Sequence, residues 1–320
     1  MNILITGGAG YIGSKVALDL INKNHNVVIV DNLVSGQKKN VPKKSIFYKC
    51  DISEKKKIHK ILEKNKIDTV FHFAALISVE ESIKKPALYI YNNYQKSKIF
   101  LNCCLSKNIK YFIFSSTAAV YGNKFFKVKE NSIRKPINAY GKSKFLFENF
   151  IIGLKSNVNF CILRYFNVAG ADNKLRIGQR GKNKPTHLIR KLIDSILLKR
   201  KFMIYGKNYK TKDGTAIRDF ININDLSDIH IKSMQYIIKN KIKLLILNCG
   251  YGKGFSVKDV VFAAKKKYNF SYEITNKRKG DAAYVVADNL RLKKILKWKP
   301  KFNSLDKILK SSLEWELKNR

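Results

Sequence analysis

Acidic residues are scarce in this 320-residue chain, and arginine is scarce among its basic residues. The chain has 23 Asp and Glu against 64 Lys and Arg, a formal net charge of +41, and ten of the basic residues are arginine. Such a charge attracts any polyanion, but recognition of bases and phosphates favours the bidentate fork of arginine. The lysines are spread along the whole chain, together with many Ile and Asn residues. This distribution is typical of drift towards A/T-rich codons. The composition therefore predicts no specific nucleic-acid partner.

Long apolar runs are also absent. The longest, such as LLIL at 244–247, are far too short to cross a bilayer. The first residues, MNILITGG, lack the basic stretch and the long apolar region of a signal peptide. We therefore expect no membrane partner and a cytoplasmic location.

Cysteines are few and are not spaced as metal ligands. Cys50, Cys161 and Cys249 stand singly in apolar runs, and Cys103 is adjacent to Cys104. No C-x-x-C pair or ligand-spaced Cys/His set appears, so neither structural zinc nor a disulfide framework is expected. We predict no metal site and a reducing compartment.

The first half of the chain alternates between strand-like and helix-like segments. With 45% apolar residues, the length suffices for one large or two modest domains. Such alternation predicts an α/β fold with a doubly wound parallel sheet. The expected strands are 2–6, 26–31, 46–51, 69–75, 111–116 and 160–168, and the expected helices are 11–22, 54–67, about 86–106 and 139–151.

After about Gly170 the alternation loosens. We therefore expect a sheet domain over 1–168 and a smaller C-terminal α/β cap over 169–320, with some segments of the cap returning to the main sheet. The expected elements after a Gly-, Lys- and Asn-rich loop at 171–184 are a helix at 186–198, strands at 202–206 and 219–223, and helices near 225–240, 256–268 and 303–318.

Three glycines follow the first expected strand. Gly7, Gly10 and Gly13 form G-x-x-G-x-x-G at the start of an expected helix, where glycine allows a tight turn and a close approach of pyrophosphate to the backbone. Asp31 ends the second strand, where a carboxylate accepts the ribose hydroxyls of NAD and repels the extra phosphate of NADP. A glycine triplet alone indicates a glycine-rich turn, but in this context the pattern predicts NAD as the cofactor.

A tyrosine and a lysine are spaced for joint chemistry. Tyr140 and Lys144 share one face of an expected helix. A phenol with a pKa of about 10 is a poor base at neutral pH, but a neighbouring ammonium and the positive nicotinamide ring favour the phenolate. Alone, Tyr-x-x-x-Lys is typical of a solvated helix face. Beside an NAD site, and with SSTAAVYG (115–122) ending a parallel strand, it predicts an active site.

The whole chain resembles the extended short-chain dehydrogenase/reductase family and, within it, the UDP-glucose (UDP-galactose) 4-epimerases. This resemblance implies a Rossmann sheet that binds NAD over 1–168, a UDP-sugar domain over 169–320 and a homodimer. It rests on GGAGYIGS, DNLVSG, DI at 51–52, HFAA, ES at 81–82, YNN, SSTAAVYG, YGKSK, RYFNVAGA, THLI, DGTAIRDFI and KGD.

The resemblance also implies roles for individual residues. The implied catalytic residues are Thr117, Tyr140 and Lys144, which also contact the cofactor. The other implied cofactor-binding residues are Gly7, Gly10, Tyr11, Ile12, Gly13, Asp31, Asn32, Leu33, Val34, Ser35, Gly36, Asp51, Ile52, Phe73, Ala74, Ala75, Leu76, Ile77, Asn93 and Phe166. The implied substrate-binding residues are Asn167, Leu188, Tyr205, Arg218, Arg278, Asp281 and Val285.

The implied reaction is redox-neutral epimerisation of UDP-hexoses at C4. Tyr140 takes the C4 hydroxyl proton while the C4 hydride moves to the nicotinamide, and Thr117 holds the sugar oxygen. The 4-keto sugar then turns in the pocket and is reduced from the opposite face. Arg218 and Arg278 suit the diphosphate, because guanidinium forks bind phosphates and arginine is otherwise rare here.

Three alternatives remain at this stage. A sugar-nucleotide 4,6-dehydratase of the same family needs an added acid and base to expel the C6 hydroxyl, and in that subgroup an Asp-Glu pair follows the threonine. Here those positions are Ala118 and Ala119, which cannot transfer a proton. The resemblance implies that epimerisation of UDP-N-acetylhexosamines, alone or together with UDP-hexoses, depends on the size of a rim residue. We align that residue with Val285, or with Tyr284 after a one-residue slip, and a small valine leaves room for an acetamido group. A non-catalytic NAD-sensing module would not need to keep Thr117, Tyr140 and Lys144, and this chain has all three.

Overall fold

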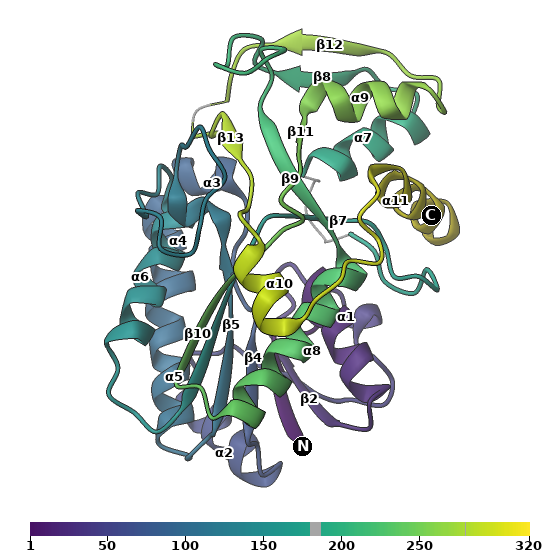
Figure 1. The fold of residues 1–320 in the computed structure, drawn as a ribbon. Coiled ribbons are helices and arrows are strands. Elements are labelled where there is room, and N and C mark those ends of the chain that lie inside the picture. Colours follow the sequence, from purple (N-terminus) through teal and green to yellow (C-terminus); the bar gives the residue numbers. More distant parts are fainter. Residues whose placement is uncertain (180–186, 279) are drawn as a thin grey trace.

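The computed structural model describes residues 1–179, 187–278 and 280–320, in a large lobe and a smaller lobe above it (Figure 1). Residues 180–184 of the expected loop, the first residue of the expected helix at 186–198 and Lys279 of the KGD motif lie outside these residues. The large lobe contains one seven-stranded sheet, and the small lobe contains two shorter ones.

The seven-stranded sheet is parallel throughout, which confirms the predicted doubly wound fold. Its order is β10-β6-β5-β4-β1-β2-β3, so the chain reverses direction between β1 and β4. Ligands bind outside the carboxyl ends of strands at such a reversal. The strands are β1 Asn2–Thr6, β2 Asn26–Asp31, β3 Ile46–Lys49, β4 Thr69–His72, β5 Tyr111–Thr117, β6 Asn159–Tyr165 and β10 Leu244–Cys249.

Helices cover both faces of this sheet because successive strand side chains point to opposite sides. In β1, Ile3 and Ile5 pack with one layer of helices and Leu4 packs with the other. One layer contains α1 Tyr11–Ile21, α8 Ile223–Asn240 and α10 Leu290–Leu296. The other contains α2 Lys55–Lys64, α5 Lys96–Leu105 and α6 Ala139–Gly153.

The helix expected at 86–106 is interrupted. It comprises α4 Pro86–Ile90, a π-helical turn η2 Tyr91–Gln95, and α5. A short helix that was not expected, α3 Val79–Lys84, precedes it. π-Turns are frequent at functional sites, and this one carries Asn93.

The small lobe has its own apolar core, built from residues from Ala169 onward. Its strands are β7 Asn167–Ala169, β8 Phe202–Tyr205, β9 Ile217–Asn222, β11 Gly254–Ser256, β12 Tyr272–Thr275 and β13 Tyr284–Val285. Its helices are α7 Leu188–Leu197, α9 Val257–Lys265 and α11 Leu305–Asn319. The remaining short turns are η1 Lys38–Asn40 and η3 Ala118–Tyr121.

Within 169–320, β10 joins the large sheet beside β6 and α8 packs on that sheet, so the chain crosses between the lobes more than once (Figure 1). Among the described residues, no helix is both long and apolar enough to cross a membrane. The same residues contain no group of three side chains placed to hold a metal ion.

Candidate functional site

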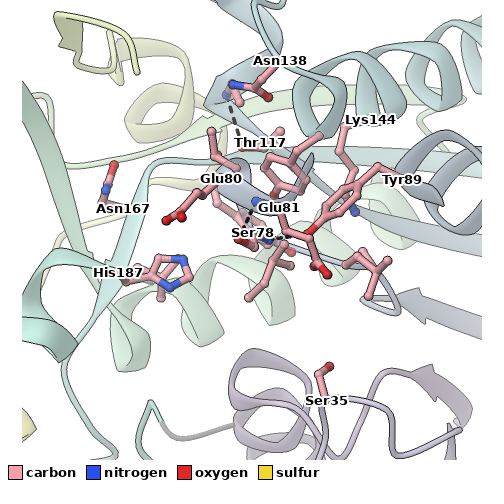
Figure 2. Close-up of a pocket in the computed structure, with 18 of the residues that line it drawn as sticks. Ser35, Ser78, Glu80, Glu81, Tyr89, Thr117, Asn138, Lys144, Asn167 and His187 are labelled. Carbon is pink, nitrogen blue, oxygen red and sulfur yellow. Dashed lines mark hydrogen bonds between the residues drawn. The ribbon is translucent and has the colours of Figure 1, made fainter. Parts of the chain in front are cut away.

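A cavity of about 820 Å³ lies at the carboxyl ends of the large sheet and extends beneath the small lobe. Ligand pockets commonly measure about 300–1,000 Å³, so this one has room for a large ligand. All predicted site residues line it except Leu33, Gly36 and Asn93. Figure 2 labels several of the lining residues, among them Thr117, Lys144, Ser78, Glu80, Glu81, Asn167 and His187.

The glycine-rich turn after β1 fits a pyrophosphate. Gly7 has a φ of +71°, and a Cβ there would lie 2.7 Å from the backbone nitrogen of Ala74. A Cβ on Gly13 would lie 2.4 Å from the Gly7 carbonyl oxygen. No side chain caps the helix after Gly10, so the first amides of α1 remain available to an anion.

Asp31 is held rigidly at the end of β2. Its two carboxylate oxygens accept the backbone N–H groups of Ala9 at 3.0 Å and Leu33 at 2.8 Å. A Cβ on Gly36 would approach both oxygens to 3.0 Å. The predicted residues Leu33 and Gly36 therefore surround Asp31 instead of lining the cavity, while Asp31 lines it.

Asp51 is charged and has a lysine partner that the sequence did not reveal. Lys96 Nζ lies 2.7 Å from its carboxylate and Asn32 Nδ2 lies 3.0 Å away. Burial raises the pKa of Asp51, but hydrogen bonds from Lys96, Ser53 and Asn32 outweigh it and lower the pKa to about 2. Because lysine is so common in this chain, the sequence did not distinguish Lys96 from the other lysines.

Asn93 supports the cavity wall from behind. The Asn93 side chain donates to the Leu76 carbonyl oxygen at 2.9 Å and accepts the Leu76 amide at 2.8 Å. It also donates to Ser143 Oγ at 3.2 Å on α6. Asn93, predicted to bind the cofactor, does not line the cavity itself but holds Leu76, which does.

The three predicted catalytic residues meet at one end of β5 and α6. Thr117 ends β5, and its hydroxyl hydrogen-bonds Tyr140 in the first turn of α6. Lys144, one turn later, donates from Nζ to the Ser115 carbonyl oxygen at 2.8 Å. Burial raises the pKa of Tyr140, and the Thr117 hydrogen bond opposes that rise. Burial lowers the pKa of Lys144 to about 7, against the opposing charge of Glu148.

Backbone contact brings α6 and η3 together. A Cβ on Gly141 would lie 2.6 Å from the Ala119 carbonyl oxygen, so only glycine allows this approach beside Tyr140. Asn138 caps α6 by accepting the Gly141 amide at 2.8 Å. Ala118 and Ala119 both line the cavity, and Ala118 also packs in an apolar cluster.

The small lobe supplies positive charge to the other end of the cavity. Arg218 lies on β9, opposite Val285 of β13 in the strand register. The Arg278 guanidinium carbon lies 3.5 Å from the centre of the Tyr205 ring, and Lys191 Nζ lies 5.8 Å from it. Burial lowers the pKa of Lys191, and the charge of Arg278 lowers it further. Such crowding of cations suits an anionic ligand.

Lys191 and His187 line the cavity but were not predicted. His187 immediately precedes α7, and burial lowers its pKa. Neither belongs to a spacing pattern that carries chemistry, so no signal in the sequence alone could have found them.

Comparison with known proteins gives consistent matches. Residues 3–250 match the model of the NAD dependent epimerase/dehydratase family. A UDP-glucose 4-epimerase of Lactobacillus helveticus is 37% identical over 98% of this chain and 97% of its own. The crystal structure of UDP-glucose-4-epimerase from Stenotrophomonas maltophila, with bound NAD and formylated UDP-arabinopyranose, matches with a TM-score of 0.94 and 30% identity over 100% of this chain and 98% of that one. The UDP-Glc/GlcNAc 4-epimerase of Campylobacter jejuni matches with a TM-score of 0.84 and 38% identity, covering 99% of each chain. Similarity therefore extends over both lobes.

Proposed function

The chain belongs to the NAD dependent epimerase/dehydratase family, and from that premise we propose that it interconverts UDP-glucose and UDP-galactose by epimerisation at C4. The observation that carries this proposal is that Thr117, Tyr140 and Lys144 meet in one cavity beside Ala118 and Ala119. This arrangement offers a base for C4 oxidation and no second acid or base at the two alanines for elimination at C6.

The cavity fits NAD, because the glycine turn accepts a pyrophosphate and Asp31 is held where ribose hydroxyls would lie. NAD held there would supply reversible hydride transfer. Tyr140 takes the proton from the C4 hydroxyl and later gives it back, while Thr117 steers the sugar oxygen. Lys144, anchored to the Ser115 carbonyl, places a positive charge near the phenolate.

The small lobe holds the UDP portion while the sugar turns. Arg218 and Arg278 bind the diphosphate, and Lys191 adds a third positive charge at the same end of the cavity. Anchoring of this kind leaves the 4-keto sugar free to present its other face to the cofactor.

The direct test is incubation of the purified protein with a panel of UDP-hexoses, with and without added NAD. We expect C4 epimers of UDP-glucose and UDP-galactose, formed without added NAD if the cofactor is retained tightly. A 4-keto-6-deoxy product would instead assign a dehydratase. Absence of turnover even with added NAD would refute the proposal.

A second substrate class follows from Val285. Its small side chain lines the cavity on β13, and the similar Campylobacter jejuni protein is a UDP-Glc/GlcNAc 4-epimerase. We propose that this enzyme also accepts UDP-N-acetylhexosamines.

We expect Val285→Tyr to abolish turnover of UDP-N-acetylgalactosamine and to retain most turnover of UDP-galactose, because the larger ring fills the space for the acetamido group. Steady-state kinetics with both substrates measure this selectivity, and Val285→Ala is the matched control that keeps the space open. If the unmodified enzyme shows no turnover of the N-acetylated substrate, the dual specificity is wrong.

We propose a homodimer formed through the helices beside α6. Leu88 on α4, Tyr91 on η2 and Ile152 on α6 are 41%, 55% and 41% exposed, and α4 packs against α6. Light scattering after size exclusion should give twice the chain mass, and Tyr91→Asp should give the monomer. A monomeric unmodified protein would contradict the proposal.

We propose that the reaction belongs to galactose metabolism and that it takes place in the cytoplasm. All five cysteines are free and buried, which supports a reducing compartment.

A further inference from the structure

A buried ion pair lies directly behind the proposed catalytic residues. Glu148 follows Lys144 by one turn of α6, and Arg164 lies on β6, with side chains 0% and 1% exposed. Arg164 Nε lies 2.9 and 3.2 Å from the two carboxylate oxygens, and Nη2 lies 2.8 Å from one of them. This is the fork-like geometry in which Arg–carboxylate pairs are strongest and most directional.

The pair joins both ends of the segment that carries Thr117. Ser116, immediately before Thr117, donates its hydroxyl to Glu148 Oε1 at 2.5 Å. Arg164 Nη1 donates to the hydroxyl of Tyr121, the last residue of η3, at 2.7 Å. Tyr121 in turn donates to Asn248 Oδ1 at 2.7 Å on β10. This network of hydrogen bonds therefore connects the end of β5, the turn η3 and helix α6.

Stability alone is a weak reason for such a pair. Replacing a buried ion pair by apolar side chains of similar volume is often neutral or stabilising. This chain is also poor in acidic residues and in arginine, yet one of each stands here. A bidentate pair does fix geometry, because its two parallel hydrogen bonds hold α6 and β6 at one separation and one angle.

We propose that Glu148 is a positioning residue for the catalytic centre: together with Arg164 it sets the placement of Thr117 relative to Tyr140 and Lys144, and its negative charge acts on Lys144 one helical turn away. This inference rests on the proposed epimerase function. Glu148 touches neither substrate nor cofactor in this account, since it does not line the cavity.

The charge acts in a defined direction. Burial lowers the pKa of Lys144 and Glu148 raises it, so Glu148 favours the ammonium. The other titratable groups near this end of the cavity are Tyr140 of the same helix, Tyr165 of β6 and His72 of β4. Burial disfavours the charged form of all three groups: it raises the pKa of both phenols and lowers the pKa of the imidazole. Glu148 is therefore the negative charge to which Lys144 responds.

Glu148→Gln keeps the size and one acceptor oxygen but removes the charge. We expect kcat to fall about tenfold through loss of alignment. We also expect both limbs of the pH profile of kcat/KM to move to lower pH by on the order of one unit, because a negative charge no longer favours protonated Lys144 or opposes ionisation of Tyr140. A merely structural residue would scale the profile without moving its limbs.

Two further variants separate charge from geometry. Glu148→Asp keeps the charge and shortens the side chain, so kcat should fall while the limbs stay in place. Arg134→Met is the matched control, because Arg134 Nη1 contacts the same carboxylate at 2.8 Å from a more exposed position; its profile should match that of the unmodified enzyme.

The outcomes distinguish this inference from the function on which it rests. If the unmodified enzyme does not epimerise UDP-hexoses, the proposed function fails before any variant is compared. If it does, and folded Glu148→Gln shows unmoved limbs, the positioning role of the charge is refuted. If Glu148→Gln does not fold by circular dichroism, Glu148→Asp decides, and an unchanged kcat in that variant overturns the proposal.

Discussion

Tyr140→Phe should lower the interconversion of UDP-glucose and UDP-galactose by about 10²–10⁴-fold, the range typical for loss of a general acid–base group. The phenylalanine ring keeps the packing of the first turn of α6 but has no oxygen to take the C4 proton or to accept the hydrogen bond of Thr117. NAD binding should survive, because the glycine turn and Asp31 lie on other elements.

The measurement is the initial rate with each UDP-sugar, together with the NAD content of the denatured protein. Tyr111→Phe is the matched control, since Tyr111 begins β5 at the end opposite Thr117 and does not line the cavity. Unchanged turnover in Tyr140→Phe would refute the assigned base. Loss of NAD would show that the variant acts on binding.

Arg164→Met should lower the free energy of unfolding by about 3 kcal/mol, the lower end of the range for a buried pair that loses one partner. Glu148 would keep the hydrogen bond of Ser116 and the contact of Arg134 but would lose the Arg164 fork while 0% exposed. Urea unfolding followed by circular dichroism measures the change.

Two controls test whether the lower free energy of unfolding comes from the unpaired buried charge. Lys201→Met breaks a pair with Glu273 in which both side chains are more than half exposed, so it should change stability by less than about 1 kcal/mol. The double variant Glu148→Leu with Arg164→Met removes both charges and should recover most of the lost stability. Equal losses in the single and double variants would contradict this account of the buried charge.

The sequence predicted six of the seven strands of the large sheet, because they are continuous apolar runs separated by helices, but it did not predict β10. It predicted less where an element depends on its partners. β13 has two residues and exists because Tyr284 and Val285 pair with β9, and α10 is a seven-residue helix fixed by Leu292 and Leu296 in the core. The expected strand at 69–75 ends at His72 instead, because beyond it the chain forms the cavity wall.

The cavity was predictable where glycine or a strand-end carboxylate leaves a pattern, as at Gly7 and Asp31. It was not predictable where the functional group is a lysine, because a chain this rich in lysine hides Lys96 and Lys191 among the rest. The π-helical interruption at η2 was not predicted for a different reason. The hydrogen bonds of Asn93 to Leu76 join segments 17 residues apart, and such contacts leave no local pattern in the sequence.

The alanine pair after Thr117 also limits how the enzyme can diverge. Ala118 is 4% exposed and packs with Val120, Phe166 and other apolar residues, so an aspartate there would place a charge against apolar neighbours at the cavity wall. The backbone of Ala119 already touches Gly141, which leaves little freedom to move η3 aside. A mutational path from epimerase to dehydratase would therefore need compensating changes in the surrounding cluster first, and exchanging the two alanines alone should yield an unstable protein before it yields a new product.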